Sequence, residues 1–434
     1  MTVIILGFVI LLVGLIVGMP VVYAFGLAVI MMVAGLGYDM SFIMTTAYFK
    51  VSAFTLLCIP LFVLAGGIIE KGRMGGYLVD FINKFLGRFK CALAYVSTIT
   101  CAVFGALTGS AAATQACIGS ILTPRMKEAG YSDGFIGALF ANVSMLGLLI
   151  PPSSLMIVVA WSTGMSVLTC FMSTLVPGLL LALLFCVVSG VVLRKDTNIK
   201  PMPRAESTSV WLKDVGHTTK KAFPVLLFPV IILGGIYGGY MTPTESAAVG
   251  AFYAILAAMV IYRSITWKDL GKSLVSSGTT AGVIMMSIFM VGVVSKVLTY
   301  AGLPEIIANA VRSFTTSRYV VLIFINIILI IMGMLMDDTS AVLICAPLFL
   351  PLATEIGINP YHFAAIFGVN LGMAAVTPPS APNLYMACRV CSCKLKDMLK
   401  PNLQFIFFAW IPVLILTTIF PELSLFVPRL MGLL

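Results

Sequence analysis

Four short polar stretches interrupt an otherwise apolar chain, and their residue types suit the binding of a small cation. They lie at 109–114, 147–154, 337–340 and 374–383. The first and third carry hydroxyl or carboxylate oxygens, and the second and fourth each contain a Pro-Pro-Ser sequence. Because proline has no amide hydrogen, a doubled proline leaves backbone carbonyls four residues earlier without their helical donor. Hard oxygen ligands of this kind suit hard cations, so the pattern predicts Na⁺ binding.

We predict two Na⁺ sites, each joining one polar tip to one proline break. The ligands of the first are expected from Ser110, Asn142, Ser144 and Gly147. Those of the second are expected from Asp337, Asp338, Thr339, Asn370, Ala374 and Thr377. Helices that begin beyond the tips and breaks would direct their positive ends to the same region, which favours an anionic substrate group. The predicted substrate contacts are Ser153, Ser154, Ser380 and Asn383. No organic cofactor is predicted.

Structural interpretations of the same residues stay open. A proline in a membrane helix is often only a kink, and Asp337 and Asp338 could cap a helix beside water. Glu245 is expected in the first turn of a helix, in a structural role. Three cations near the ends of apolar runs are expected to reach the membrane surface, with a substrate carboxylate as the alternative contact; they are Lys50, Lys296 and Arg389.

The amino-acid composition indicates the class of protein to which these residues belong. Of 434 residues, 60% are hydrophobic and 10% are charged, against about 25% charged residues in an ordinary soluble domain. This excludes a soluble fold, and disorder requires low hydrophobicity. We predict an all-α polytopic membrane protein with about 10–11 transmembrane helices, at about 20 residues a span. The net charge of +10 is assigned to cytoplasmic loops and not to a nucleic-acid partner.

Apolar runs place the expected helices. Spans are predicted at 3–19, 21–37, 52–69, 134–165, 170–193, 222–240, 244–262, 273–298, 361–388 and 402–420. Two more runs, 92–124 and 319–352, are broken near their middle by small or polar residues. Two half-length helices that meet at such a tip form a re-entrant hairpin, tolerated at membrane depth only beside protein or water.

The two halves of the chain repeat one pattern. Pro124-x3-Glu128-x-Gly130, followed by Pro-Pro-Ser at 151–153, recurs from Pro351 at a constant offset of 227 residues. The predicted domains follow from this repeat. The first is 1–193, with scaffold helices 1–90 and a hairpin and broken helix at 92–165; a cytoplasmic linker is expected at 194–221; the second is 222–434, with scaffold helices 222–300, a hairpin and broken helix at 319–388 and a last helix at 402–420.

Charge orients the halves. With the N-terminus outside, 21 of the 26 basic residues fall in inner loops, as the positive-inside rule requires. The first half then starts outside and the second inside, so the repeats are inverted. Inverted repeats with discontinuous helices at matching positions are typical of secondary transporters with sites at the bilayer midplane.

These motifs resemble those of a known family. The stretch Met241-Thr-Pro-Thr-Glu245, the tip Gly109-Ser110, the sequence Gly333-Met-Leu-Met-Asp337 and the two Pro-Pro-Ser breaks resemble the large membrane subunit of tripartite ATP-independent periplasmic (TRAP) transporters. The resemblance runs from the first helix to the last. One departure is Ala111, where the family often has a second serine, so a backbone oxygen would have to substitute there.

The resemblance implies a function and partners. It implies Na⁺-driven uptake of an organic acid across a bacterial inner membrane, in which hairpins and broken helices move against a scaffold as an elevator. It also implies a small four-helix membrane subunit and a periplasmic substrate-binding protein as partners. Sialic acid is the expected substrate and C4-dicarboxylates are the alternative.

Three other functions compete with this one. The first is a binding-protein-independent, ion-coupled anion exchanger or exporter. A membrane-embedded enzyme would need paired acids near Arg or His at one interface, and the adjacent acids Asp337 and Asp338 lie in mid-hairpin. A channel fits poorly, because broken inverted repeats imply alternating access. We therefore predict a transporter and not an enzyme.

Overall fold

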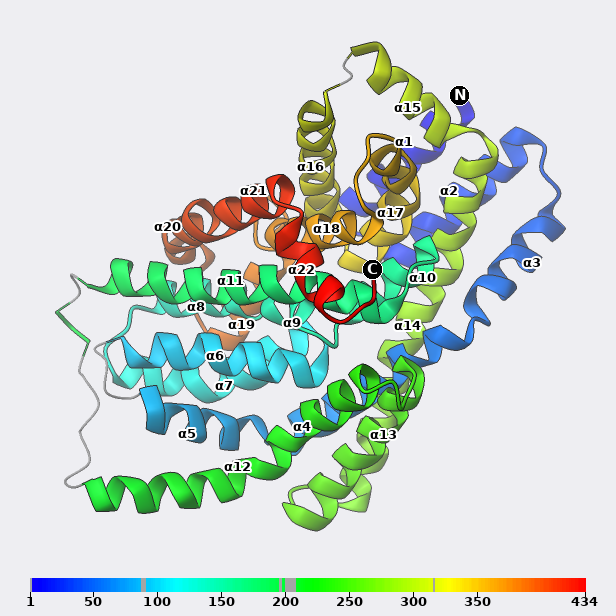
Figure 1. The fold of residues 1–434 in the computed structure, drawn as a ribbon. Coiled ribbons are helices and arrows are strands. Elements are labelled where there is room, and N and C mark those ends of the chain that lie inside the picture. The colour runs from blue at the N-terminus through cyan, green and yellow to red at the C-terminus, as the bar shows by residue number, and fades with distance from the viewer. Residues whose placement is uncertain (1, 87–90, 195–196, 200–207, 315–316) are drawn as a thin grey trace.

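The computed structural model describes residues 2–86, 91–194, 197–199, 208–314 and 317–434, which form helices joined by turns (Figure 1). The first half contains α1 (Thr2–Ile16), α2 (Val21–Leu36), α3 (Met40–Val51), η1 (Phe54–Leu57), α4 (Cys58–Lys71), α5 (Gly75–Leu86), α6 (Ala92–Thr108), α7 (Ala111–Glu128), α8 (Asp133–Val143), α9 (Leu146–Leu149), α10 (Ser154–Thr163) and α11 (Val167–Leu193). The second half contains α12 (Thr208–Tyr237), α13 (Pro243–Leu256), η2 (Ala257–Ile261), α14 (Trp267–Tyr300), α15 (Leu303–Phe314), α16 (Arg318–Leu335), α17 (Asp338–Glu355), α18 (Pro360–Ala374), α19 (Pro382–Cys391), α20 (Leu395–Phe405), η3 (Ile406–Trp410), α21 (Ile411–Ile419) and α22 (Glu422–Leu430). The all-helical prediction is confirmed.

The number of long apolar helices is smaller than the number of spans expected from sequence. Among the described residues, eight helices are long and apolar enough to cross a membrane, or up to nine if α8–α9 and α10 form one bent span. The helices α1, α2 and α6 are apolar but shorter. With 16 residues, α2 extends about 24 Å, less than the roughly 30 Å of a hydrocarbon core. The multi-pass membrane class is confirmed.

Two predicted boundaries shift. The expected linker at 194–221 is helical from Thr208 onwards, because α12 begins at that residue and extends to Tyr237. The last long helix covers 395–419 instead of 402–420 and contains the π-helical stretch η3. Glu245 lies in the first turn of a helix, as expected. Thr242 is the N-cap of α13, and the Glu245 carboxylate accepts the Thr242 amide hydrogen.

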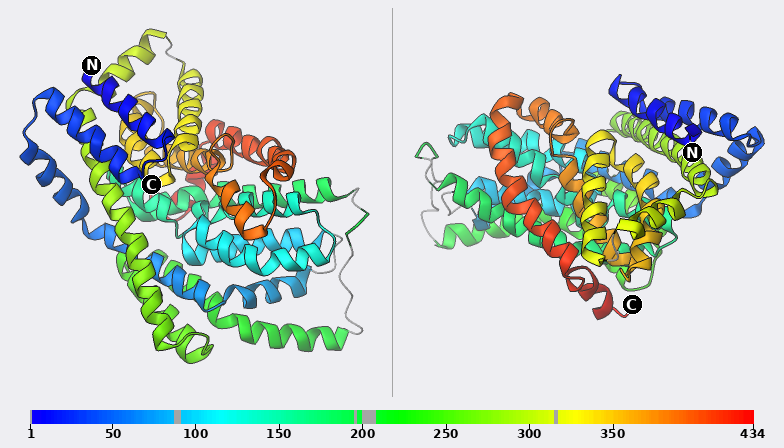
Figure 2. Two further views of the ribbon diagram at one scale, coloured as in Figure 1. Left: turned by 180° about the vertical axis from the view of Figure 1, so that it is seen from behind. Right: turned by 90° about the horizontal axis from the view of Figure 1, so that it is seen from above.

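The helices form two groups, and each group draws on both halves of the chain. The first group, called the frame below, consists of α1–α4 and α12–α14; α13 packs against α4, and α14 packs against α2, α3 and α4. The second group, called the hairpin group, consists of α6–α11 and α16–α21; α8 packs against α19 and α20, and α11 packs against α18. The two groups are in contact, because α14 also packs against α17, and α5 packs against both α6 and α12. Figures 1 and 2 show the frame along one side of the hairpin group.

Local chemistry explains where the hairpins turn. The first arm, α6, ends at Gly109, whose φ of 61° is left-handed and favours glycine. The second arm, α7, starts with Ser110 as N-cap, and its hydroxyl accepts the Ala113 amide hydrogen. In the second hairpin, Asp337 caps α17 in the same way. The predicted hairpin tips are therefore real chain reversals.

Candidate functional site

Both hairpin tips and both proline breaks meet at one cavity of about 290 Å³. Ser110 reaches it from the first tip, and Asp337, Asp338 and Thr339 reach it from the second. From the broken helices come Ser154, at the start of α10, and Asn383, at the start of α19. These residues are spread over about 270 positions of sequence, and they are six of the twelve polar residues predicted for the sites. We call this cavity the central cavity.

The first tip lies directly on the first break. The Ser154 backbone amide and hydroxyl both donate to the Gly109 carbonyl oxygen, at 3.2 and 2.7 Å. A Cβ added to Gly105 would lie 2.5 Å from the Cα of Gly147. A side chain on either glycine would therefore push the tip away from the break.

The first Pro-Pro pair leaves two backbone carbonyls without their helical donor, and these two carbonyls differ in their hydrogen bonding. The Ser153 hydroxyl donates to the Leu148 carbonyl oxygen at 2.6 Å. No described residue donates a hydrogen bond to the Gly147 carbonyl. Beside Gly147 lie two further oxygens, the Ser110 carbonyl and the Thr114 hydroxyl, each 3.2 Å from the position that its Cβ would take. These two oxygens are hydrogen-bonded to each other, since the Thr114 hydroxyl donates to the Ser110 carbonyl at 2.7 Å.

The second tip carries the carboxylates. Both carboxylate oxygens of Asp337 accept hydrogen bonds from Ser340, one from its hydroxyl at 2.6 Å and one from its amide at 3.2 Å. Asp337 is exposed to the cavity, and Asp338 and Thr339 are half-buried beside it. The open interpretation that these acids cap a helix therefore holds for Asp337. It does not exclude a second role, because each carboxylate oxygen has a further lone pair.

The second break differs from the first. The Ala374 carbonyl accepts the Thr377 amide hydrogen at 3.0 Å, and the Ala375 carbonyl accepts that of Asn383 at 3.3 Å. The Thr377 hydroxyl donates to the Met373 carbonyl. Ala374 instead packs on the second hairpin, 2.7 Å from the position that a Cβ of Gly333 would take. This contact is the counterpart of Gly105 on Gly147 in the first half.

Two predicted ligands lie in buried hydrogen-bond networks away from the central cavity. The Asn142 amide donates to the Asn402 side chain and accepts the indole hydrogen of Trp410, both at 2.8 Å. Asn370 donates to Asn326. Neither Asn142 nor Asn370 lines the cavity formed by the described residues. Sequence reasoning missed Asn326, Asn402 and Trp410, although an amide inside an apolar run was a usable signal.

The remaining predicted contacts divide between the two environments. Ser144 accepts a hydrogen bond from the Asn383 side-chain amide at 2.9 Å, which joins the first broken helix to the second. Ser153 is fully buried in its bond to Leu148. Ser380 is exposed and is not part of the cavity lining that the structure describes. Of the predicted substrate contacts, Ser154 and Asn383 therefore face the central cavity.

We predict that Asn142→Leu destabilises the fold. It would leave the Asn402 carbonyl and the Trp410 indole without their partner in a fully buried place, which should cost about 2–4 kcal/mol of unfolding free energy. Thermal unfolding of the purified protein measures this as a lower midpoint. An unchanged midpoint together with a weakened apparent affinity for Na⁺ would instead show that Asn142 is a cation ligand.

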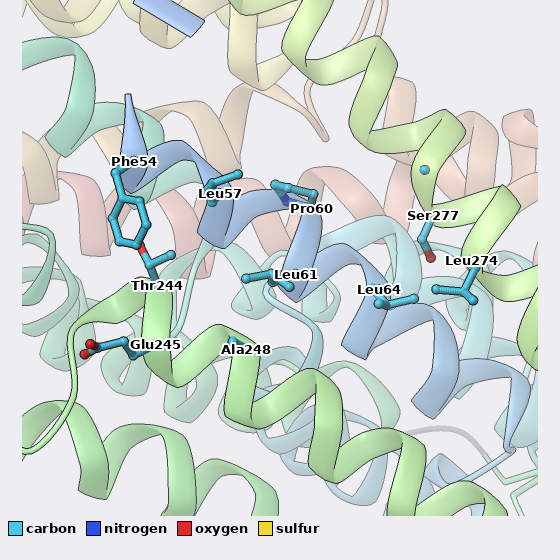
Figure 3. A pocket seen from close by; sticks show the side chains of 11 residues that line it. Phe54, Leu57, Pro60, Leu61, Leu64, Thr244, Glu245, Ala248, Leu274 and Ser277 are labelled. Atoms are coloured by element: carbon cyan, nitrogen blue, oxygen red, sulfur yellow. The ribbon is translucent and has the colours of Figure 1, made fainter. Parts of the chain in front are cut away.

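A larger cavity lies elsewhere and is mainly apolar. It has about 570 Å³ and lies in the frame between α4, α13 and α14 (Figure 3). Leu57, Leu61 and Leu64 of one wall face Ala248 and Leu274 of the others. Glu245 lies at its edge, and its carboxylate is engaged by Thr242. The other polar residues that line this larger cavity are Thr244 and Ser277. The central cavity is smaller but is lined by two carboxylates and both hairpin tips, so it is the candidate functional site.

The fold of the chain is similar to that of a membrane transporter of known structure. The crystal structure of the Alcanivorax borkumensis YdaH transporter matches with a TM-score of 0.60 over 88% of each chain. Because only 12% of residues are identical, this likeness concerns the fold alone.

The sequence comparisons define the family. Residues 8–423 match the family described as "Tripartite ATP-independent periplasmic transporter, DctM component", and the chain belongs to this family. It is 37% identical to the C4-dicarboxylate TRAP transporter large permease protein DctM of Pseudomonas aeruginosa, over 87% of each chain. It is 32% identical to the isethionate TRAP transporter permease protein DctMQ of Oleidesulfovibrio alaskensis, over 95% of this chain and 64% of that one. The resemblance seen in the sequence is confirmed, and the chain is a transporter permease and not an enzyme.

Proposed function

We propose that this chain is the large permease of a Na⁺-coupled TRAP transporter that imports an organic anion. The observation that carries the proposal is the meeting of both tips and both breaks at the central cavity. Asp337 and Asp338 supply negative charge for cations at the second tip, while the Gly147 carbonyl and the Ser110 tip supply neutral oxygens at the first. Helices α7, α10, α17 and α19 begin near the cavity, and their positive ends favour an anion.

We infer an elevator movement from the division into two groups of helices. The hairpin group contains every residue that lines the central cavity, and the frame contains none of them among the described residues. The cavity can therefore move as one body against the frame without being taken apart. The N-terminus is placed on the periplasmic side of a bacterial inner membrane, because this orientation leaves most basic residues inside.

The proposed partners follow from the family. As one component of a tripartite transporter, the chain needs two others, which we propose are a small four-helix membrane subunit and a periplasmic substrate-binding protein. The relative named DctMQ is longer than this chain, which covers 64% of it, and its name is consistent with a fused small subunit. The lipid bilayer surrounds the apolar outer surface.

Two substrates are proposed. C4-dicarboxylates are favoured by the relative that is 37% identical, and sialic acid is the substrate that the resemblance to the family implies. Both carry carboxylates that the positive helix ends can receive. The isethionate relative indicates that the family accepts more than one kind of organic anion.

Transport in proteoliposomes tests the proposal. We expect labelled succinate or N-acetylneuraminate to accumulate only with an inward Na⁺ gradient, the small subunit and the binding protein. The control replaces Na⁺ by an equal K⁺ gradient. Uptake that ignores Na⁺ would refute coupling, and uptake without the binding protein would favour the alternative of an anion exchanger or exporter.

A further inference from the structure

A second polar cavity lies where the frame meets the hairpin group. It has about 370 Å³, and α3 lines it with Thr46, Phe49 and Lys50. The frame helix α14 adds Lys296, and α10 of the hairpin group adds Trp161. We call it the lysine pocket. Its two cations come from the frame, and its aromatic residues come from both groups, Phe49 from α3 and Trp161 from α10.

The two lysines face aromatic rings. The Lys50 ammonium lies 5.0 Å from the ring centroid of Trp161, and the Lys296 ammonium lies 4.7 Å from that of Tyr300. No described carboxylate forms an ion pair with either lysine. Both side chains are half-buried, so water screens their positive charges only in part. Two like charges held together in this way favour an anion between them.

Of the three other basic residues that the charge assignment leaves outside, two have acidic partners, and Arg318 forms no ion pair with a described residue. Arg312 pairs with Glu355, and Arg429 pairs with Glu422. Snorkelling to the membrane surface, the interpretation first given to Lys50 and Lys296, would direct the two ammonium groups away from the protein. Instead they line one cavity with Trp161.

The backbone of α14 holds Lys50 in place. The methylene groups of Lys50 pack over Gly292, where an added Cβ would lie 3.6 Å from Lys50 Cγ and 3.7 Å from Lys50 Cβ. Lys296 is four residues further along the same helix, hence on the same face. Burial, and then the charge of Lys296, lower the pKa of Lys50. An anion in the pocket would oppose the repulsion between the two lysines and favour their charged forms.

One short helix joins the lysine pocket to the central cavity. Ser154, at the start of α10, lines the central cavity, and Trp161, near its end, lines the lysine pocket. Seven residues of α-helix extend about 10 Å. An anion in the lysine pocket is therefore separated from the proposed transport site by about the length of this helix segment. In the proposed orientation the pocket lies on the periplasmic side.

We propose that the lysine pocket binds the carboxylate of an organic anion on its way to the central cavity. Lys50 and Lys296 supply charge-assisted hydrogen bonds, and the Trp161 ring supplies an apolar wall for the carbon skeleton. The proposal rests on the proposed function for the identity of the anion. Its binding chemistry stands on the residues of the pocket alone.

The direct test is binding of succinate and of N-acetylneuraminate to the purified permease in Na⁺-free buffer, followed by thermal stabilisation. Succinamide serves as the neutral control ligand. We expect at least one of the acids to bind, with its dissociation constant raised about tenfold in Lys50→Gln and in Lys296→Gln. Lys50→Arg should retain most of the affinity. The matched control Lys272→Gln changes an exposed lysine at the other end of α14 and should bind as the wild type does.

Transport then separates this proposal from the proposed function. In the complete system we expect Lys50→Gln to raise the KM for substrate about tenfold with Vmax and Na⁺ dependence unchanged. Lysine-dependent acid binding by a permease that transports neither acid would uphold the pocket and overturn both proposed substrates. A wild type that transports, with equal binding by all variants, would overturn the pocket.

Two further arms identify other sources of the anion. Weaker docking of the substrate-free binding protein to the lysine variants would mean that the pocket receives a protein carboxylate, which overturns the proposal. An effect that is present in phosphatidylglycerol liposomes and absent in phosphatidylcholine liposomes would mean a lipid headgroup, which overturns it too. A KM effect equal in both lipids supports the substrate carboxylate.

Discussion

Replacement of Asp337 by asparagine is expected to abolish Na⁺-stimulated uptake while leaving the permease folded. Asp337 has two roles in the structure that this one change separates. As N-cap of α17 it accepts the Ser340 amide hydrogen, and asparagine caps helices about equally well. Asparagine cannot replace the negative charge that Asp337 places at the wall of the central cavity.

The expected size follows from the loss of a charged ligand. Interactions with a charged group in a partly dehydrated site are worth about 1.5–3 kcal/mol, so uptake at limiting Na⁺ should fall about 100-fold at the upper end of that range. Proteoliposome uptake measured against Na⁺ concentration checks this, and thermal unfolding confirms that the fold is retained.

Asp39→Asn is the matched control. Asp39 also caps a helix, α3, through a hydrogen bond from the Ser41 amide, and it is exposed in the frame, away from the central cavity. Uptake by Asp39→Asn should equal that of the wild type. If Asp337→Asn also transports normally, Asp337 only caps α17 and the second cation site must be rejected.

Replacement of Gly105 by alanine is expected to separate the first hairpin from its break. The new Cβ would lie 2.5 Å from the Gly147 Cα and 2.8 Å from its amide nitrogen. Backbone atoms cannot rotate away as a side chain can, so the substitution should cost about 3 kcal/mol or more of stability. Uptake should be lost as well, because Ser110 and Gly147 would no longer meet.

A graded series makes this prediction specific. Gly333→Ala, in the second half, should act in the same way, since its Cβ would lie 2.7 Å from that of Ala374. Gly147→Ala should be milder, because its Cβ would lie 3.1 Å from Gly105. Gly282→Ala, on α14, has no neighbour within 4 Å of the added Cβ and should be neutral or slightly stabilising. Midpoints of thermal unfolding rank the four variants, and equal midpoints for Gly105→Ala and Gly282→Ala would contradict the close approach.

Local chemistry made the hairpins and breaks predictable from sequence. A buried chain segment must satisfy its backbone hydrogen bonds, so a doubled proline or a Gly-Ser tip in an apolar run has few possible structures. The structure contains chain reversals at Ser110 and Asp337 and breaks at both Pro-Pro pairs. The same constraint, repeated at one offset, also predicted that the halves would be alike.

The direction of polar side chains was not predictable in this way. Asn142 was predicted as a ligand, yet its partners Asn402 and Trp410 are about 260 residues away in sequence. A side-chain amide points to whichever buried group needs a partner, and only packing decides which group that is. The choice between ligand and structural network therefore depended on α20 and η3, which no local pattern connects to α8.

The sequence by itself determined the membrane class, the helical fold, the broken elements and the family, because hydropathy, proline and charge act over short stretches of chain. Tertiary structure alone decided that four polar stretches share the central cavity, that Gly105 lies on Gly147, and that Lys50 crosses Gly292 beside Lys296. Such contacts arise where helix faces from distant parts of the chain pack closely. Their geometry is a property of the packed pair and is not contained in either helix.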